Sequence, residues 1–421
     1  MKKVIIILIV ILSLFFLSFL NFKEKEEKVN KNISVILETE EGNIKTNTFP
    51  NKEEYDYNKT VCENTKDNIK IDFNENEWKL NLNVEEERID GKFNCTVHFK
   101  VRSKIASDVI IRKYSEDNRE GLIKLEQPST VQTPKLTEYR YSGSNDEVKN
   151  YVSFNNETWR IIGVSPVDDG NGNYEERMKI IRNDSIGSYS WDTSATSINS
   201  GAGRNQWGAV TSHSGADLMK LLNSGPYYNR TSGTCYVGKA DATKSCNFTS
   251  TGLTSSAKEM IDTVKWYTAA VPIGKVDYSQ SEIYEVERGN VVGVTDVGGA
   301  ITKTYNWIGK VGVIYPSDYA YTSKMCYNSN IYLSSYADCS SSSWLYDKVV
   351  DLWTITPVRY NGEDNGRIRV VYADIDSDGD GNFYNRSAYD AIGIKPTVYL
   401  KPEIEIISGD GTKDNPYNLS L

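Results

Sequence analysis

An aspartate-rich stretch near the C-terminus has the clearest chemical meaning in the sequence. Its candidate metal ligands are Asp374, Asp376, Asp378, Asp380 and Asn382. Oxygen ligands at alternate positions around the Gly379 turn suit Ca²⁺ and resemble the opening of an EF-hand-type loop. The end of the loop does not match, because Asn385 stands where an EF-hand has a bidentate Glu and the flanking segments are predicted strands. A calcium-binding hairpin is one hypothesis, and a solvated Asp/Gly hairpin tip without metal is the alternative.

Residues on both sides of this stretch predict a contact surface. The candidate ligand-binding residues are Arg359, Tyr360, Asn361, Glu363, Arg367, Tyr384, Arg386 and Tyr389. Tyr is a rigid contact former and Arg a bidentate one, and binding surfaces are enriched in both. Surface loops that have no partner remain the alternative interpretation.

The sequence offers little material for catalysis. It has two histidines, His98 and His213, far apart along the chain, so a His-based triad or zinc site is not expected. No motif selects a pair among the 57 acidic residues for glycoside hydrolysis. The polar residues Glu282, Glu285, Glu287 and Arg288 are interpreted as a solvated face. We therefore predict a protein without catalytic residues and with no cofactor other than Ca²⁺.

The N-terminus predicts a membrane anchor. Met1-Lys2-Lys3 precedes an uncharged, mainly apolar run, Val4 to Phe22, which as a helix covers roughly 28 Å, close to the thickness of a bilayer core. Residues 1–22 are thus expected to be an uncleaved transmembrane signal anchor. The positive-inside rule places Lys2 and Lys3 in the cytoplasm and the rest of the chain outside a bacterial plasma membrane. A cleaved signal peptide and a buried soluble helix are the alternatives.

The six cysteines form three pairs that are local in sequence. The predicted pairs are Cys62 with Cys95, Cys235 with Cys246, and Cys326 with Cys339. An even number of cysteines outside the membrane favours disulfides, and pairing of neighbours is the simplest of the 15 connectivities that six cysteines allow. A net charge of −9 without a basic stripe argues against nucleic acid as a partner.

Hydrophobic patterning predicts how the chain is organised. Residues 23–32 are Lys/Glu/Asn-rich and are expected to be a spacer, whereas 33–102 alternate apolar and polar residues as a small β-sandwich does. Residues 103–138 are interpreted as an extended linker. The remaining chain, 139–421, is predicted to be a large β-rich domain with two short helices, which begin at Ser214 and Ser256. The predicted class is α+β, and four tryptophans, Trp159, Trp191, Trp307 and Trp353, are expected in the core.

Five motifs in this last segment carry a family resemblance. They are Tyr151–Val164 with its Trp-Arg-Ile-Ile-Gly core, Lys179–Asp192, Gly312–Tyr319, the Leu-Trp-Thr-Ile-Thr-Pro strand at 352–357, and Gly-Ile-Lys-Pro-Thr-Val-Tyr-Leu at 393–400. From Tyr139 to the C-terminus the chain resembles a domain of unknown function of gut Firmicutes surface proteins. The module at 33–101 looks like the β module that commonly precedes that domain. The resemblance implies architecture and place, and no activity.

The closing strands are also similar to those of C-type-lectin-like folds, including formylglycine-generating and phage-tropism relatives. That similarity implies a ligand face between Trp353 and Tyr399. No cysteine follows Cys339, so formylglycine-generating chemistry is not expected, and the Glu-Pro-Asn and Gln-Pro-Asp tripeptides of sugar-binding lectins do not occur.

Together these features predict a membrane-anchored recognition or adhesion protein of the cell surface that binds a glycan or a surface protein. A structural component of the cell envelope is the first alternative, and a hydrolase or modifying enzyme is the second.

Overall fold

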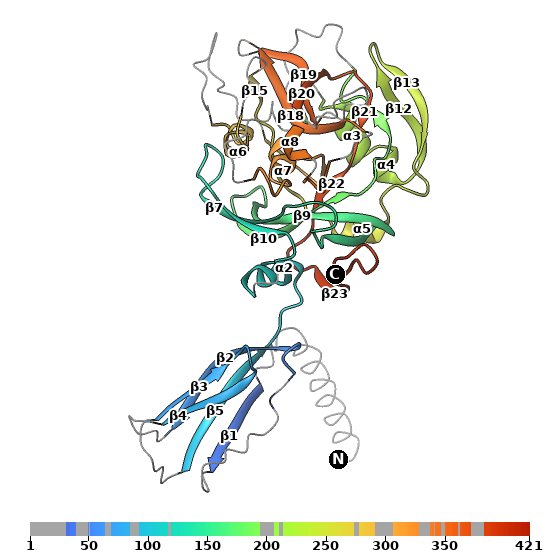
Figure 1. Cartoon of the computed structure of the whole chain (residues 1–421). Coiled ribbons are helices and arrows are strands. Elements are labelled where there is room, and N and C mark those ends of the chain that lie inside the picture. The colour runs from blue at the N-terminus through green and yellow to red at the C-terminus, as the bar shows by residue number, and fades with distance from the viewer. Residues whose placement is uncertain are drawn as a thin grey trace, which may run out of the picture. The chain divides into compact units, whose positions relative to one another are not determined.

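The computed structural model describes much of the chain from residue 31 onward (Figure 1). The described residues are 31–38, 49, 51–63, 69–84, 92–116, 119–193, 206–209, 214–272, 278–290, 306–327, 337–340, 342–346, 350–360, 363–371 and 383–421. They belong to two units, Met1–Ser103 and Lys104–Leu421. Strands outnumber helices, which confirms the prediction of a β-rich chain. Within these residues no helix has the length and apolarity needed to cross a bilayer, and the predicted anchor at 1–22 lies outside them.

Two small sheets share one core in the first unit. The strands are β1 (Lys31–Glu38), β2 (Tyr55–Glu63), β3 (Ile69–Asn74), β4 (Lys79–Val84) and β5 (Lys92–Val101). One sheet has the order β1-β5-β2, and β3 pairs with β4 in the other. Alternate residues of β5, Cys95, Val97 and Phe99, point to the same side and are buried with Phe73 of β3. The strands predicted from the alternating pattern of 33–102 are therefore present.

A nine-stranded sheet organises the second unit. Its strands are β6 (Leu122–Gln127), β7 (Leu136–Tyr141), β8 (Tyr151–Phe154), β9 (Glu157–Asp168), β10 (Tyr174–Arg182), β17 (Val311–Gly312), β22 (Thr397–Tyr399), β23 (Glu405–Ser408) and β24 (Tyr417–Ser420). The order is β17-β22-β10-β9-β8-β24-β23, and β7 pairs with both β6 and β9. Asn155 and Asn156 join β8 to β9 with positive φ angles of 57° and 60°. A two-residue hairpin turn of that geometry favours Asn, so the Asn-Asn pair stabilises this turn.

The prediction of an extended linker at 103–138 is wrong for most of this range. Residues 106–115 form helix α2 (Ala106–Ser115), and β6 and the start of β7 follow as a hairpin of the large sheet. Helix α2 buries Ala106 and Ile110, whereas Asp108 is exposed and Arg112 and Lys113 are partly exposed, which explains the mixed composition. The prolines of this segment lie in the loop between β6 and β7 rather than in an interdomain connection.

A second sheet of this unit holds most of the predicted contact residues. It contains β11 (Ser188–Tyr189), β15 (Val271–Pro272), β18 (Leu352–Tyr360), β19 (Glu363–Val371), β20 (Phe383–Ser387) and β21 (Ile392–Gly393). The order is β11-β21-β18-β19-β20, and β15 pairs with β18. Residues 352–358 of β18 are buried without interruption, the pattern of a central strand covered on both faces.

Two further strand pairs and six short helices complete the described part of the unit. The hairpin β12 (Ser232–Gly238) with β13 (Ala242–Asn247) is one pair, and β14 (Val264–Tyr267) with the later strand β16 (Asn306–Gly309) is the other. The helices are α3 (Asp217–Asn223), α4 (Pro226–Asn229), α5 (Ser255–Met260), α6 (Gln280–Glu287), α7 (Pro316–Ala320) and α8 (Ala337–Ser340).

The prediction of two helices is only partly right. Helix α3 confirms the first, although it begins at Asp217 and not at Ser214. The second ends at Met260, Val264 to Tyr267 form a strand, and α4, α6, α7 and α8 were not predicted. The side chain of Thr254 caps α5 by accepting from the Ala257 N–H, so the helix starts one residue earlier than predicted. The following β-branched and aromatic residues favour an extended strand that pairs with β16.

Candidate functional site

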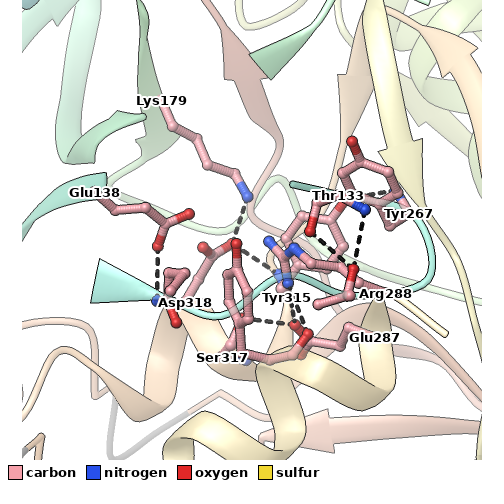
Figure 2. Close-up of polar contacts among 12 residues, drawn as sticks. Thr133, Glu138, Lys179, Tyr267, Glu287, Arg288, Tyr315, Ser317 and Asp318 are labelled. Carbon is pink, nitrogen blue, oxygen red and sulfur yellow. Dashed lines mark hydrogen bonds and ion pairs between the residues drawn. The ribbon is translucent and has the colours of Figure 1, made fainter. Parts of the chain in front are cut away.

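A network of buried charged side chains lies between β7, β10, α6 and α7 (Figure 2). Asp318, near the start of α7, is its first centre. Lys179 of β10 approaches one carboxylate oxygen, Oδ2, at 2.6 Å, and Arg140 of β7 approaches the other, Oδ1, at 2.9 Å. The backbone N–H of Tyr315 also donates to Oδ2, at 2.8 Å, and Arg140 is shared with Glu138 at 2.8 Å. Two cations and two carboxylates are thus linked in one chain of contacts.

Glu287 of α6 is the second centre of the network. The backbone N–H and the hydroxyl of Ser317 donate to its two oxygens at 2.8 and 2.6 Å. Arg288 approaches the same carboxylate at 3.2 Å and also donates to the Tyr284 carbonyl at 3.0 Å. Its guanidinium lies 3.4 Å from the centre of the Tyr284 ring, a cation–π contact.

Burial and neighbouring charges move the pKa values of these groups in different directions. Burial alone would raise the pKa of Asp318, but Lys179 and Arg140 outweigh it, so that pKa lies below its usual range. Burial lowers the pKa of Lys179 to about 8, against the attraction of Asp318. Burial raises the pKa of Glu287 to about 7, because Arg288 and Ser317 only partly compensate. The pKa of each carboxylate therefore depends on its own partners.

The network is enclosed by the described residues around it. The six charged side chains of the network are almost fully buried: Glu138, Arg140, Lys179, Glu287, Arg288 and Asp318. The cavity beside Lys179 and Asp318 measures about 10 Å³, the space of about one water molecule. The three cations and three carboxylates balance, so the arrangement suits a structural connection between sheet and helices.

The structure corrects the interpretation of residues 282–288 as a solvated face. Glu287 and Arg288 are 0% and 4% exposed, and they carry the second half of the network. Glu282 instead caps α6, where it accepts from the Ser279 N–H at 2.8 Å. A partial signal was present, because Lys179 stands between the apolar residues Met178 and Ile180, and a charge in such a setting needs a buried partner. Its distant partner, Asp318, could not be identified from sequence spacing.

The predicted contact residues converge on three neighbouring strands. Arg359 and Tyr360 end β18, and Glu363 and Arg367 belong to β19, where Tyr360 pairs with Glu363. Strand β20 pairs with β19, so the residues of these three consecutive strands share one sheet. Asn361 lies outside the described residues.

Strand β20 and the turn after it carry the other three contact residues. Tyr384 pairs with Val370 and is 49% exposed, which is high for a large aromatic side chain. Arg386 lies two residues further along the same strand, with its guanidinium 3.9 Å from Asp351. Tyr389 follows in the turn, where Lys239 approaches its ring at 5.9 Å.

A small cavity adjoins this turn. It measures about 120 Å³ and is lined in part by Tyr189, Asp217 and Tyr236. Ser190, which also lines it, donates from its hydroxyl to the Tyr389 carbonyl at 2.7 Å. The polar turn after β20 therefore lies beside a hollow in the surface.

The other predicted site residues have mixed outcomes. The five candidate calcium ligands lie outside the described residues: Asp374, Asp376, Asp378, Asp380 and Asn382. Within the described part of the chain no group of three or more acidic, His or Cys side chains is placed to hold a metal ion. All three disulfides are formed as predicted: Cys62–Cys95, Cys235–Cys246 and Cys326–Cys339.

The tryptophan prediction is confirmed for three of the four residues. Trp159, Trp191 and Trp353 are fully buried, whereas Trp307 is only partly buried against the core.

No protein-family model, curated protein or solved structure matches the chain. A functional assignment therefore depends on the residues and contacts described above.

Proposed function

We propose that this chain is a membrane-anchored, extracytoplasmic recognition protein without catalytic activity. It binds a glycan or a surface protein through a contact surface on β18, β19, β20 and the following turn. The anchor is the apolar run at 1–22, the location is the outer side of a bacterial plasma membrane, and the second unit is a C-type-lectin-like domain. The last proposal rests on the motifs of its closing strands.

The observation that carries this proposal is the exposure of Tyr384 on a strand shared with Arg386. Alternate residues of a strand point to the same face, so this aromatic ring and this guanidinium are presented together. Aromatic and Arg side chains dominate binding energy at interfaces. The small cavity beside Tyr389 adds a hollow into which part of a ligand can extend.

Two further features support a binding role over catalysis. The six buried charged groups of the network are enclosed and have access to about one water molecule. The contact surface lies on paired strands, and β12–β13 beside the cavity is cross-linked by Cys235–Cys246. A rigid scaffold of this kind lowers the entropy cost of binding.

The test is binding of the purified full chain to bacterial envelope glycans, mucins and whole cells, each in Ca²⁺ and in EDTA. Tyr384→Ala is the test variant, and Ile407→Ala is its control because Ile407 is a similarly exposed apolar side chain, at 55%, on another strand. We expect Tyr384→Ala to weaken binding by about tenfold, and Ile407→Ala to leave it unchanged. Equal binding by both variants would reject this surface, and no binding to any target would favour a structural envelope role.

The calcium hypothesis is tested in the same assay. Binding that is lost in EDTA and in the double variant Asp376→Asn with Asp378→Asn would support a metal-dependent loop. Binding that is equal in EDTA and in Ca²⁺ would reject it.

A further inference from the structure

A cationic cavity lies in a different part of the second unit. It measures about 290 Å³ and is bordered by the end of α2, strand β6 and the segment after α7. Its polar and aromatic lining residues are Tyr114, Arg119, Lys124, Ser142, Lys324 and Tyr327. Three of these are cations, and no acidic residue is among the described lining residues. Three cationic side chains thus line one cavity of a chain whose net charge is −9.

The framework of this cavity is fixed by backbone contacts and a disulfide. The Ser142 N–H donates to the Gly121 carbonyl at 2.8 Å, which ties the floor to the start of β6. The Tyr327 N–H donates to the Ser323 carbonyl at 2.9 Å. The adjacent Cys326 is cross-linked to Cys339, so the wall that carries Lys324 and Tyr327 is held in place.

The lysines of the cavity are able to rearrange toward a ligand. Lys124 is paired with Glu126 at 2.9 Å, and Lys324 with Glu147 at 3.0 Å. All four side chains are substantially exposed, between 40% and 63%. Exposed ion pairs contribute little free energy, so a bound anion can compete with these glutamates for the lysines.

Ser142 provides a second and independent sign of a ligand site. The residue is 1% exposed and lines the cavity, yet its hydroxyl has no hydrogen-bond partner among the described residues. A buried hydroxyl without a partner is costly, and such groups normally bond to protein, water or ligand. Rotation of this side chain toward the cavity would let an oxygen of a bound ligand satisfy it.

We propose that this cavity binds one anionic, hydroxylated unit, such as a sugar acid or a polyol phosphate. Arg119, Lys124 and Lys324 surround the anionic group, the Ser142 hydroxyl donates to one of its oxygens, and Tyr114 and Tyr327 contact the carbon skeleton. The guanidinium of Arg119 lies 4.5 Å from the centre of the Tyr114 ring, which orients a planar donor set at the cavity wall.

The volume limits the occupant. Small-molecule sites start at about 300 Å³, so this cavity takes a single sugar-sized unit and not a folded segment of a protein. The site is separate from the contact surface on β18–β20, and it does not depend on that surface for binding.

The test is calorimetric titration of the purified full chain with three probes at low ionic strength. Glucuronate carries a carboxylate, glycerol 1-phosphate carries a phosphate, and glucose is the neutral control. We expect one or both anions to bind and glucose not to bind, and the stronger anion identifies the source of the charge. Lys324→Gln and Ser142→Ala are each expected to weaken anion binding by about tenfold, since each removes one contact to a charged group.

Lys413→Gln is the matched control, because it removes the same charge from another exposed position of the second unit. Equal loss in Lys324→Gln and Lys413→Gln would show that only net charge matters and would overturn the proposal. The proposal would also be overturned if neither anion binds at a concentration of about 10 mM, ten times a dissociation constant of about 1 mM. Neither result bears on the proposed function, which is tested at Tyr384.

Discussion

The second unit contains two groups of charged residues, of which one is buried and the other lines an open cavity. The buried network around Asp318 and Glu287 balances three cations with three carboxylates and excludes solvent. The cationic cavity has three cations, no acidic lining residue among those described, and space for a small molecule. A balanced, enclosed set of charges is suited to hold elements together, whereas exposed lysines at an open cavity can exchange their glutamate partners for an anionic ligand.

The largest effect is expected from breaking the buried network at Asp318. Asp318→Ala leaves Lys179 and Arg140 buried without their shared carboxylate, and it should lower the free energy of unfolding by about 3–5 kcal/mol. Chemical denaturation of the second unit measures this loss. Glu126→Gln is the control at the cavity, where the exposed pair with Lys124 should make no measurable difference. A comparable loss in both variants would contradict the distinction between the two groups.

The stability of the protein is expected to depend on pH through the titration of Glu287, the second centre of the network. Burial raises the pKa of Glu287 to about 7, so the folded state holds a proton that the unfolded state releases near pH 4.5. Between these values the folded state binds more protons, and stability contributed by this group therefore falls as pH rises. Relative to Glu287→Gln, the parent should lose about 3 kcal/mol of unfolding free energy from pH 4.5 to 8.

Unfolding titrations of both proteins at several pH values test this prediction. Other carboxylates of the network, such as Asp318, have lowered pKa values and act in the opposite direction, so only the difference between parent and variant isolates Glu287. Parallel stability curves for the two proteins would show that Glu287 does not titrate in this range.

The Cys326–Cys339 disulfide is expected to stabilise both the fold and the wall of the cationic cavity. Replacing both cysteines by Ser should cost about 2–3 kcal/mol of unfolding free energy, the usual range for a loop of this size. It should also weaken anion binding, because Lys324 and Tyr327 lie directly beside Cys326. The equivalent replacement of Cys235 and Cys246 is the control, with a similar stability loss and unchanged anion binding.

Local features of this fold were predictable, and long-range partners were not. The disulfide pairs, helix α3 and the strands around Trp159 and Trp353 follow from spacing and periodicity. The linker prediction failed because helix α2 is half-exposed, and its mixed composition resembles that of a solvated segment. The sequence analysis also placed Glu287 on a solvated face, since nothing local indicates that Ser317, 30 residues away, donates to its carboxylate.

The two candidate sites differ in the same way. The contact residues on β18, β19 and β20 are close in sequence, so composition alone could group them. Arg119 and Lys324 are separated by about 200 residues, and only the pairing of β6 with β7 and the fold of the following sheet bring their segments together. Charge clusters assembled from distant segments require the tertiary structure.

The smallest effect is expected from replacing a glutamate by glutamine in each of the two groups. The replacement should strengthen ligand binding at the cavity but lower the stability of the buried network. Glu147→Gln removes the carboxylate that pairs with Lys324 and keeps an oxygen that can accept from the Ser144 N–H. It should strengthen anion binding by about two- to fivefold, since Lys324 no longer has a competing partner. Glu138→Gln in the network should instead destabilise the fold, because Arg140 loses a buried ion pair, and it should leave anion binding unchanged. Calorimetric titration and denaturation of both variants measure the two effects, and weaker anion binding by Glu147→Gln would show that this glutamate is part of the ligand site rather than a competitor for it.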